Sequence, residues 1–210
     1  MRGSSPLIHC ITNYVTAGDT ANMLLAAGAS PIMADDPSES AEITALAQGL
    51  TLNLGTPSGS RVEAMLRSGA EANRCGIPVV FDPVGAGCSG FRRNSAGEIL
   101  RRVRLTAIRG NLSEISYLAG FESRENGVDS SETRITAAEA AQTAAKKLGC
   151  VCAVTGERDV ISDGSRTVTI LSGTPLLKKV TGAGCMTSAL CAAMCTACLL
   201  YTSPSPRDTR

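Results

Sequence analysis

The stretch Val180-Thr-Gly-Ala-Gly-Cys-Met-Thr-Ser-Ala189 says most about the fold of this chain. Its glycines, Gly182 and Gly184, allow the backbone to turn so that consecutive N–H groups point the same way. The Ala-rich sequence that follows predicts a helix over residues 186–198, whose N-terminus adds partial positive charge at the same place. The pattern predicts an anion-binding loop that suits a transferring phosphoryl group. A glycine turn that only leads into a buried helix is the structural alternative.

The sequence on either side of this loop alternates between short apolar segments and helix-like segments. Strands are expected at residues 6–11, 29–33, 50–54, 78–81, 105–108, 151–155 and 168–171. Helices are expected near residues 19–27, 39–48, 59–75, 96–104, 112–119 and 137–148. This order is typical of βαβ units, and it predicts an α/β domain with a mostly parallel central sheet. Residues 159–171 predict an antiparallel hairpin at the end of that sheet.

Polar or glycine-containing loops follow most of the expected strands. They carry Asn13, Asp35-Asp36, Asn53-Leu-Gly55, Asp82-Pro-Val-Gly85, Arg109-Gly-Asn111 and Thr155-Gly156. Ligands of open parallel sheets bind beyond the carboxyl ends of the strands. Each loop alone is equally well explained as an ordinary turn, but together they predict one binding site. The stretch that ends at Ala189 lacks the Lys-Ser/Thr of a P-loop, so that nucleotide-binding fold is disfavoured.

Composition narrows the class of protein and its partners. A chain of 210 residues, of which 43% are hydrophobic, suits one large domain with a sizeable core. With 20 basic and 19 acidic residues the chain shows no basic excess, so we expect no nucleic-acid partner. The nine cysteines lack zinc-type spacing, which favours free thiols and a cytoplasmic location. The N-terminus does not resemble a signal peptide, and no apolar stretch reaches membrane-spanning length.

The loop also resembles a known one. Residues 182–185 are similar to the Gly-Ala-Gly-Asp anion hole of the ribokinase-like superfamily, and Cys185 replaces the catalytic Asp of most members. A Cys at this position is typical of the hydroxyethylthiazole kinase family. Six further motifs resemble that family in the expected order: His9-Cys-Ile-Thr-Asn-Tyr-Val-Thr16, Pro31-Ile-Met-Ala-Asp-Asp-Pro-Ser-Glu39, Asn53-Leu-Gly-Thr56, Asp82-Pro-Val-Gly-Ala-Gly87, Arg109-Gly-Asn-Leu-Ser-Glu114 and Val154-Thr-Gly156.

The resemblance implies a fold, a reaction and an assembly. The fold is the ribokinase-like three-layer α/β/α architecture. The reaction is ATP- and Mg²⁺-dependent phosphorylation of the primary alcohol of 4-methyl-5-(2-hydroxyethyl)thiazole in thiamine salvage. The assembly is a homotrimer, with the thiazole site at a subunit boundary. Members of the family continue past the last helix, so residues 1–200 are expected to be a kinase domain without its final helices. Residues 201–210 change abruptly to Ser, Pro and Arg and are expected to be a non-native tail.

The resemblance also implies a role for each matching residue. Cys185 lies beside the substrate hydroxyl, and the anion hole is formed with it by Gly182, Ala183 and Gly184. Asp82 and Glu114 hold or orient Mg²⁺, directly or through water. The residues assigned to ATP are Arg109 and Thr155, which contact its phosphates, together with Glu114. The residues assigned to the thiazole pocket are Met33, Gly182 and Asn13.

Each of these residues has a structural alternative. Asp82 could cap a loop, Arg109 could pair with Glu114, and Glu114 could only stabilise the first turn of a helix. Thr155 could be a turn residue and Met33 a core residue, and the single His9 is expected to be structural. Cys185, at a helix N-terminus, can act as a weak base toward the alcohol or can only fill space.

The function has alternatives as well. Other ribokinase-like enzymes, such as hydroxymethylpyrimidine kinases or nicotinamide-nucleotide repair dehydratases, are expected to have Asp at position 185. A thiazole-binding protein without catalytic activity belongs to a different class. Binding of ATP distinguishes the two classes, because a pure thiazole binder does not need it.

Overall fold

The computed structural model describes residues 5–121, 135–171 and 173–201. The polar stretch at residues 122–133, which contains Gly and Ser, predicts a surface loop and lies outside these ranges, as do residues 202–210 of the expected tail. Tyr201, the first residue of that tail, lies inside them.

An eight-stranded sheet forms the centre of the molecule, with the order β2-β1-β3-β4-β5-β6-β7-β8. Six neighbouring strands are parallel, and β7 and β8 form the antiparallel end. This confirms the mostly parallel sheet and the hairpin predicted from the sequence. The strands are β1 (Leu7–Ile11), β2 (Ser30–Ile32), β3 (Gly49–Asn53), β4 (Val79–Asp82), β5 (Ala107–Gly110), β6 (Val151–Val154), β7 (Asp159–Ser162) and β8 (Thr167–Ile170).

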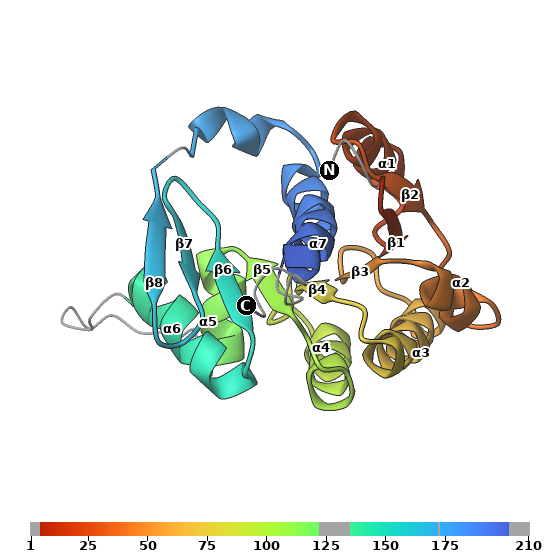
Figure 1. Ribbon diagram of the computed structural model, residues 1–210. Helices are drawn as coiled ribbons and strands as arrows, with labels where there is room; N and C mark the ends of the chain where they lie inside the picture. The colour runs from red at the N-terminus through yellow and green to blue at the C-terminus, as the bar shows by residue number, and fades with distance from the viewer. Residues whose placement is uncertain (1–4, 122–134, 172, 202–210) are drawn as a thin grey trace, which may run out of the picture.

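Helices cover both faces of this sheet, so the architecture has three layers (Figure 1). One face carries α1 (Ala17–Ala26) and α7 (Ala183–Tyr201), which pack against each other. The other face carries α3 (Gly59–Cys75), α4 (Gly90–Arg102), α5 (Leu112–Ala119) and α6 (Ala137–Leu148), with α2 (Ser40–Leu46) packed on α3. A short 3₁₀ helix, Pro175–Lys179, leads into α7.

The strands fill two separate cores because their side chains alternate between the two faces. In β4, Val79 and Phe81 belong to the larger core beneath α3, α4, α5 and α6. Val80 belongs to the smaller core beneath α1 and α7. All three side chains are fully buried, as expected for a central parallel strand with helices on both faces.

Two helices begin three or more residues before the predicted position. Helix α4 begins at Gly90 and not near residue 96, because the Ser89 side chain accepts a hydrogen bond from the Arg92 N–H and so starts the helix before its apolar part. Helix α7 begins at Ala183 and not at Met186, so Gly184 and Cys185 lie in its first turn. In the described ranges no helix is long and apolar enough to span a membrane.

Candidate active site

The predicted anion-binding loop lies at the N-terminus of α7, above the carboxyl ends of β1, β3 and β4. Gly182 has φ +75°, a conformation that favours glycine, and an added Cβ there would lie 2.3 Å from the methyl group of Thr16. The N–H groups of Gly184 and Cys185 are in the first helical turn, where the helix offers them no carbonyl partner. These groups and the helix dipole together favour a bound anion.

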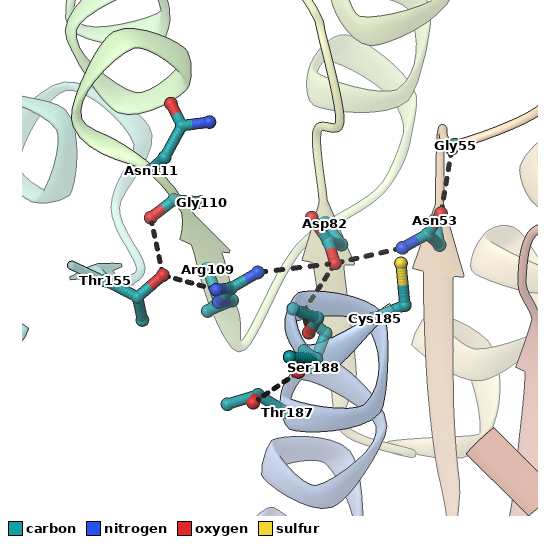
Figure 2. Close-up of polar contacts among 12 residues, drawn as sticks. Asn53, Gly55, Asp82, Arg109, Gly110, Asn111, Thr155, Cys185, Thr187 and Ser188 are labelled. Carbon is teal, nitrogen blue, oxygen red and sulfur yellow. Dashed lines mark hydrogen bonds and ion pairs between the residues drawn. The ribbon is translucent and has the colours of Figure 1, made fainter. Parts of the chain in front are cut away.

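Asp82 ends β4 and lies in the middle of a polar cluster (Figure 2). Its Oδ2 accepts hydrogen bonds from Asn53 Nδ2 at 2.9 Å and from Ser188 Oγ at 2.7 Å. Arg109 Nη1 lies 3.8 Å from the same oxygen. The other oxygen, Oδ1, is buried and has no hydrogen-bond partner among the described residues. Asp82 therefore has one anchored oxygen and one that is free to accept a proton or a cation.

Burial dominates the acidity of Asp82. The side chain is 1% exposed, and loss of hydration raises its pKa to about 6, although Arg109 and the hydrogen bond from Ser188 act in the opposite direction. A carboxylate whose ionisation is this costly gains stability from a cation brought near it. Perturbed acidity of this kind is common at functional sites.

Arg109 connects the cluster at Asp82 with the anion-binding loop. Its guanidinium donates to Thr155 Oγ1, and Thr155 in turn donates to the carbonyl of Gly110 at 3.3 Å (Figure 2). A Cβ added to Gly184 would lie 2.5 Å from Arg109 Nη1, so the guanidinium covers this glycine closely. Arg109 forms its ion pair with Asp82. The structural alternative, a pair between Arg109 and Glu114, is therefore not observed among the described residues.

Glu114 acts as a connector between two loops. Its Oε2 accepts from the Asn111 N–H at 2.8 Å in a capping box that opens α5. Its Oε1 accepts from the Gly85 N–H at 2.9 Å, which fixes the loop that follows Asp82. Both carboxylate oxygens are therefore occupied by backbone donors, and each retains capacity for one further contact, such as a water molecule.

Cys185 and Asn13 are brought together from distant parts of the chain. Asn13 Nδ2 donates a hydrogen bond to Cys185 Sγ at 3.0 Å. Asn13 is nearly buried, whereas Cys185 is partly exposed. The side chain of Cys185 thus faces the loop after β1, whereas the backbone N–H of Cys185 belongs to the anion-binding turn.

Two other residues singled out from the sequence lie outside this cluster. Met33 follows β2 at the edge of the sheet, with its side chain 38% exposed. It is therefore a surface residue and not a core residue. His9 is fully buried, and its ring nitrogens contact Thr44 Oγ1 at 2.8 Å and the Ala34 carbonyl at 2.7 Å, as expected for a structural histidine.

A cavity of about 350 Å³ opens beside Arg109 and Gly184. Its walls are the start of α7, the segment after β6, and the chain that leads into the 3₁₀ helix and α7. Its lining combines the guanidinium of Arg109 with glycine-containing turns and with two acidic residues, Glu157 and Asp159. This shape and polarity suit the phosphates and the sugar of a nucleotide.

Sequence reasoning missed two residues that hold the site together. Ser188 is in the quoted stretch, four residues after Gly184, and this spacing places both on one face of α7. Thr16 ends the motif that begins at His9, and its backbone N–H and Oγ1 both donate to Asn13 Oδ1 at 3.1 Å. The i+4 spacing was a usable signal for Ser188. No local pattern indicates the contact between Thr16 and Gly182.

The fold and site together define the class of this protein. The structure of a ribokinase-like superfamily protein from Enterococcus faecalis matches with a TM-score of 0.62 and 11% identity, over 90% of this chain and 70% of that one. Adenosine kinase from Sinorhizobium meliloti matches with a TM-score of 0.56 and 16% identity, over 90% of this chain and 64% of that one. The chain has the ribokinase-like fold.

More similar proteins identify the family. The sequence model of the hydroxyethylthiazole kinase family matches residues 1–202. Hydroxyethylthiazole kinase from Ruminiclostridium cellulolyticum is 52% identical over 198 residues, which are 93% of this chain and 72% of that protein. The structure of the hydroxyethylthiazole kinase protein from Pyrococcus horikoshii OT3 has a TM-score of 0.83 and 40% identity, covering 93% of this chain and 73% of that one. The chain belongs to the hydroxyethylthiazole kinase family.

Proposed function

We propose that this chain is a kinase that transfers the γ-phosphoryl group of ATP to the primary alcohol of 4-methyl-5-(2-hydroxyethyl)thiazole, in thiamine salvage. Membership of the family supports the choice of reaction and substrate. The observation that carries the proposal is the juxtaposition of the loop at residues 182–185, the Arg109 guanidinium over Gly184, and the free oxygen of Asp82.

Phosphoryl transfer needs positioning and charge stabilisation more than covalent chemistry. The first-turn N–H groups of Gly184 and Cys185 would donate to the oxygens of the transferring group. Arg109, held by Thr155 and Asp82, would add positive charge from the other side. The cavity beside them would hold the rest of the nucleotide.

The residues present fit a magnesium ion. Mg²⁺ is usually bound by one or two carboxylates together with the phosphates of a substrate, without a dedicated cage of protein ligands. The described residues contain no group of three or more His, Cys, Asp or Glu side chains placed to hold a metal. Asp82 would hold the ion through its free Oδ1, and Glu114 would act through water. When bound, the ion neutralises phosphate charge as the transfer proceeds.

Cys185 is proposed to lie beside the alcohol and to accept its proton. The support is its place in the anion-binding turn together with the hydrogen bond from Asn13, which leaves the sulfur as an acceptor. Asn13 has a second amide hydrogen, which we assign to the substrate. Gly182 and Met33 are proposed to line the thiazole pocket, with Met33 at its outer rim because its side chain is exposed.

A homotrimer that works in the cytoplasm is proposed as the functional form. Tyr14 and Val15, directly after Asn13, are 72% and 59% exposed, and the guanidinium of Arg61 lies over the Tyr14 ring while pairing with Asp35. Exposed apolar side chains gathered beside a site are typical of a protein–protein contact. A neighbouring subunit that covered them would also cover Met33, two residues before Asp35.

The test is a comparison of two alcohols. With Mg-ATP, turnover is expected on the hydroxyethylthiazole and little on a hydroxymethylpyrimidine of similar size. The Cys185→Asp variant is expected to retain activity, since a carboxylate can also accept the proton, and Cys185→Ala is expected to be slower by about 10²–10⁴-fold. Turnover of the pyrimidine without turnover of the thiazole would overturn the substrate assignment.

A further inference from the structure

Thr16 contacts two parts of the site at once. It is 2% exposed and stands at the N-terminal end of α1, far from α7 in sequence. Its hydroxyl donates to Asn13 Oδ1 at 3.1 Å, and its backbone N–H donates to the same oxygen at 3.1 Å. Its methyl carbon lies 2.3 Å from the position that a Cβ of Gly182 would take, so it fills the space beside this glycine. One side chain therefore carries two separable contacts, one polar and one apolar.

The polar contact decides which way the Asn13 amide faces. The oxygen and nitrogen of an amide have nearly the same shape, so only the hydrogen-bond partners fix their positions. Because both donors of Thr16 point at Oδ1, the NH₂ group must lie on the other side, where it donates to Cys185 Sγ at 3.0 Å. A reversed amide would place its oxygen against the sulfur and its NH₂ group against the Thr16 backbone N–H, which can only donate, although the hydroxyl could turn to accept from it.

We propose that Thr16 is a positioning residue: its hydroxyl adds a second donor to Asn13 Oδ1 and so strengthens the orientation in which the amide donates to Cys185, and its methyl group packs against Gly182 of the anion-binding turn. This inference deepens the proposed function and rests on it for its catalytic meaning. The orientation itself has a consequence that needs no substrate. Alkylation takes place at the sulfur atom itself, so its rate reports whether the Asn13 amide still lies against Cys185 Sγ.

The two halves of the side chain can be removed one at a time. Thr16→Val keeps a methyl group and the shape but loses the hydroxyl donor. Thr16→Ser keeps the hydroxyl and loses the methyl group. Thr20→Val is a matched control, because Thr20 is a fully buried threonine on the same helix whose hydroxyl has no hydrogen-bond partner among the described residues.

The primary measurement is the rate at which iodoacetamide alkylates Cys185, followed by mass spectrometry of its peptide, with the exposed Cys88 as an internal reference. Thr16→Val is expected to slow the alkylation of Cys185 about fivefold, the equivalent of one ordinary hydrogen bond. Thr16→Ser and Thr20→Val are expected to stay within about twofold of the original chain. The kcat with the thiazole alcohol is expected to follow the same order, with the KM for ATP unchanged in Thr16→Val.

Two further variants separate positioning from folding. Asn13→Asp keeps an acceptor for Thr16 but cannot donate to Cys185, so it is expected to slow alkylation even if Thr16→Val is too unstable to study. In an Asn13→Ala background, Thr16→Val is expected to have no additional effect on Cys185. An unchanged alkylation rate in Thr16→Val, or an equal effect of that change with and without Asn13, would overturn the inference.

These outcomes are distinct from failure of the proposed function. If the chain does not phosphorylate the thiazole alcohol but the alkylation rates follow the expected order, the orientation of Asn13 by Thr16 stands and the reaction assignment fails. If phosphorylation is observed and the alkylation rates are all equal, the reaction stands and the inference about Thr16 fails.

Discussion

Gly182 and Gly184 are both required in the anion-binding turn, for different physical reasons. Gly182 adopts a positive φ and has the Thr16 methyl group against it, so a side chain there is strained and also obstructed. Gly184 has no such backbone constraint, but the Arg109 guanidinium occupies the place of its missing Cβ. The first glycine shapes the turn, and the second allows a positive charge to approach it.

Gly184→Val is expected to lower kcat by at least about 10²-fold, because the new side chain displaces Arg109 and obstructs the N–H groups that face the phosphoryl group. The control is Gly97→Ala in the interior of α4, where an added Cβ meets nothing within 4 Å. That variant is expected to keep its activity and to gain up to about 1 kcal/mol of stability. Steady-state kinetics and thermal unfolding of both variants test this, and normal turnover of Gly184→Val would contradict the assigned loop.

The raised pKa of Asp82 predicts how the free energy of unfolding depends on pH. Its pKa is 3.8 without the fold and about 6 within it, raised mainly by burial. Between these values the folded chain binds more protons than the unfolded chain, so the free energy of unfolding falls as the pH rises. The fall attributable to this one group is about 3 kcal/mol and is complete above its folded pKa.

Asp82→Asn is expected to remove this fall while it abolishes the Mg²⁺ dependence of any residual turnover. Chemical denaturation of both chains from about pH 4 to pH 8 gives the free energy of unfolding of each. In the difference between the two chains the contributions of the other titrating groups cancel. The variant should gain stability relative to the original chain as the pH rises. A difference that does not change with pH would show that Asp82 is not destabilised by burial.

Two capping boxes in the described part of the chain have the same chemistry but different surroundings. Asn111 with Glu114 opens α5, and Thr136 with Glu139 opens α6. Only Glu114 also accepts a hydrogen bond from Gly85, in the loop that follows Asp82. The first box therefore links a helix start to the active site, whereas the second only starts a helix.

Glu114→Gln and Glu139→Gln form a matched pair for this difference. Each removes a charge from a first helical turn and is expected to lower the stability of the fold only slightly. Only Glu114→Gln is expected to weaken Mg²⁺-dependent turnover, because a glutamine presents one acceptor and so cannot hold both Gly85 and Asn111. Titration of Mg²⁺ against rate checks this. Equal activity of the two variants would reduce Glu114 to a helix cap.

Elements whose ends carry a local signal were predicted well from the sequence. Helix α3 and helix α6 were predicted with the bounds that the structure shows, because Ser58 and Thr136 cap them and Gly76 and Gly149 end them. The start of α4 was missed because its first turn, after Ser89, contains a single apolar residue, Phe91, and so has no hydrophobic periodicity. Hydrophobic periodicity indicates the middle of a helix, and the capping residue decides where it begins.

The candidate site could be predicted in part for a similar reason. Asp82, Arg109 and Thr155 each lie at or just after the carboxyl end of a strand, and parallel strands bring such residues to one edge of the sheet. The pairing of Asn13 with Cys185, which are 172 positions apart, depends on how α7 packs beside α1. Such tertiary contacts have no local pattern, and the same holds for the contact between Thr16 and Gly182.

Assembly gives a prediction for the whole molecule. The proposed trimer requires Tyr14, Val15 and Met33 to be covered by a neighbouring subunit, although all three are exposed in the single chain. Val15→Lys is expected to shift the protein from a trimer toward monomers, because a charge would then be buried in the contact. Size-exclusion chromatography with light scattering measures this. Leu46→Lys, on α2 and also exposed, is the control that should leave the assembly unchanged.

The most direct test of the central proposal is to quantify both products of one reaction. The chain is incubated with Mg-ATP and the hydroxyethylthiazole, and ADP and the thiazole phosphomonoester are measured together by phosphorus NMR. The account predicts equal amounts of the two, with both lost in Gly184→Val and both kept in Gly97→Ala. ADP with inorganic phosphate but no phosphomonoester, or binding of the thiazole without consumption of ATP, would contradict it.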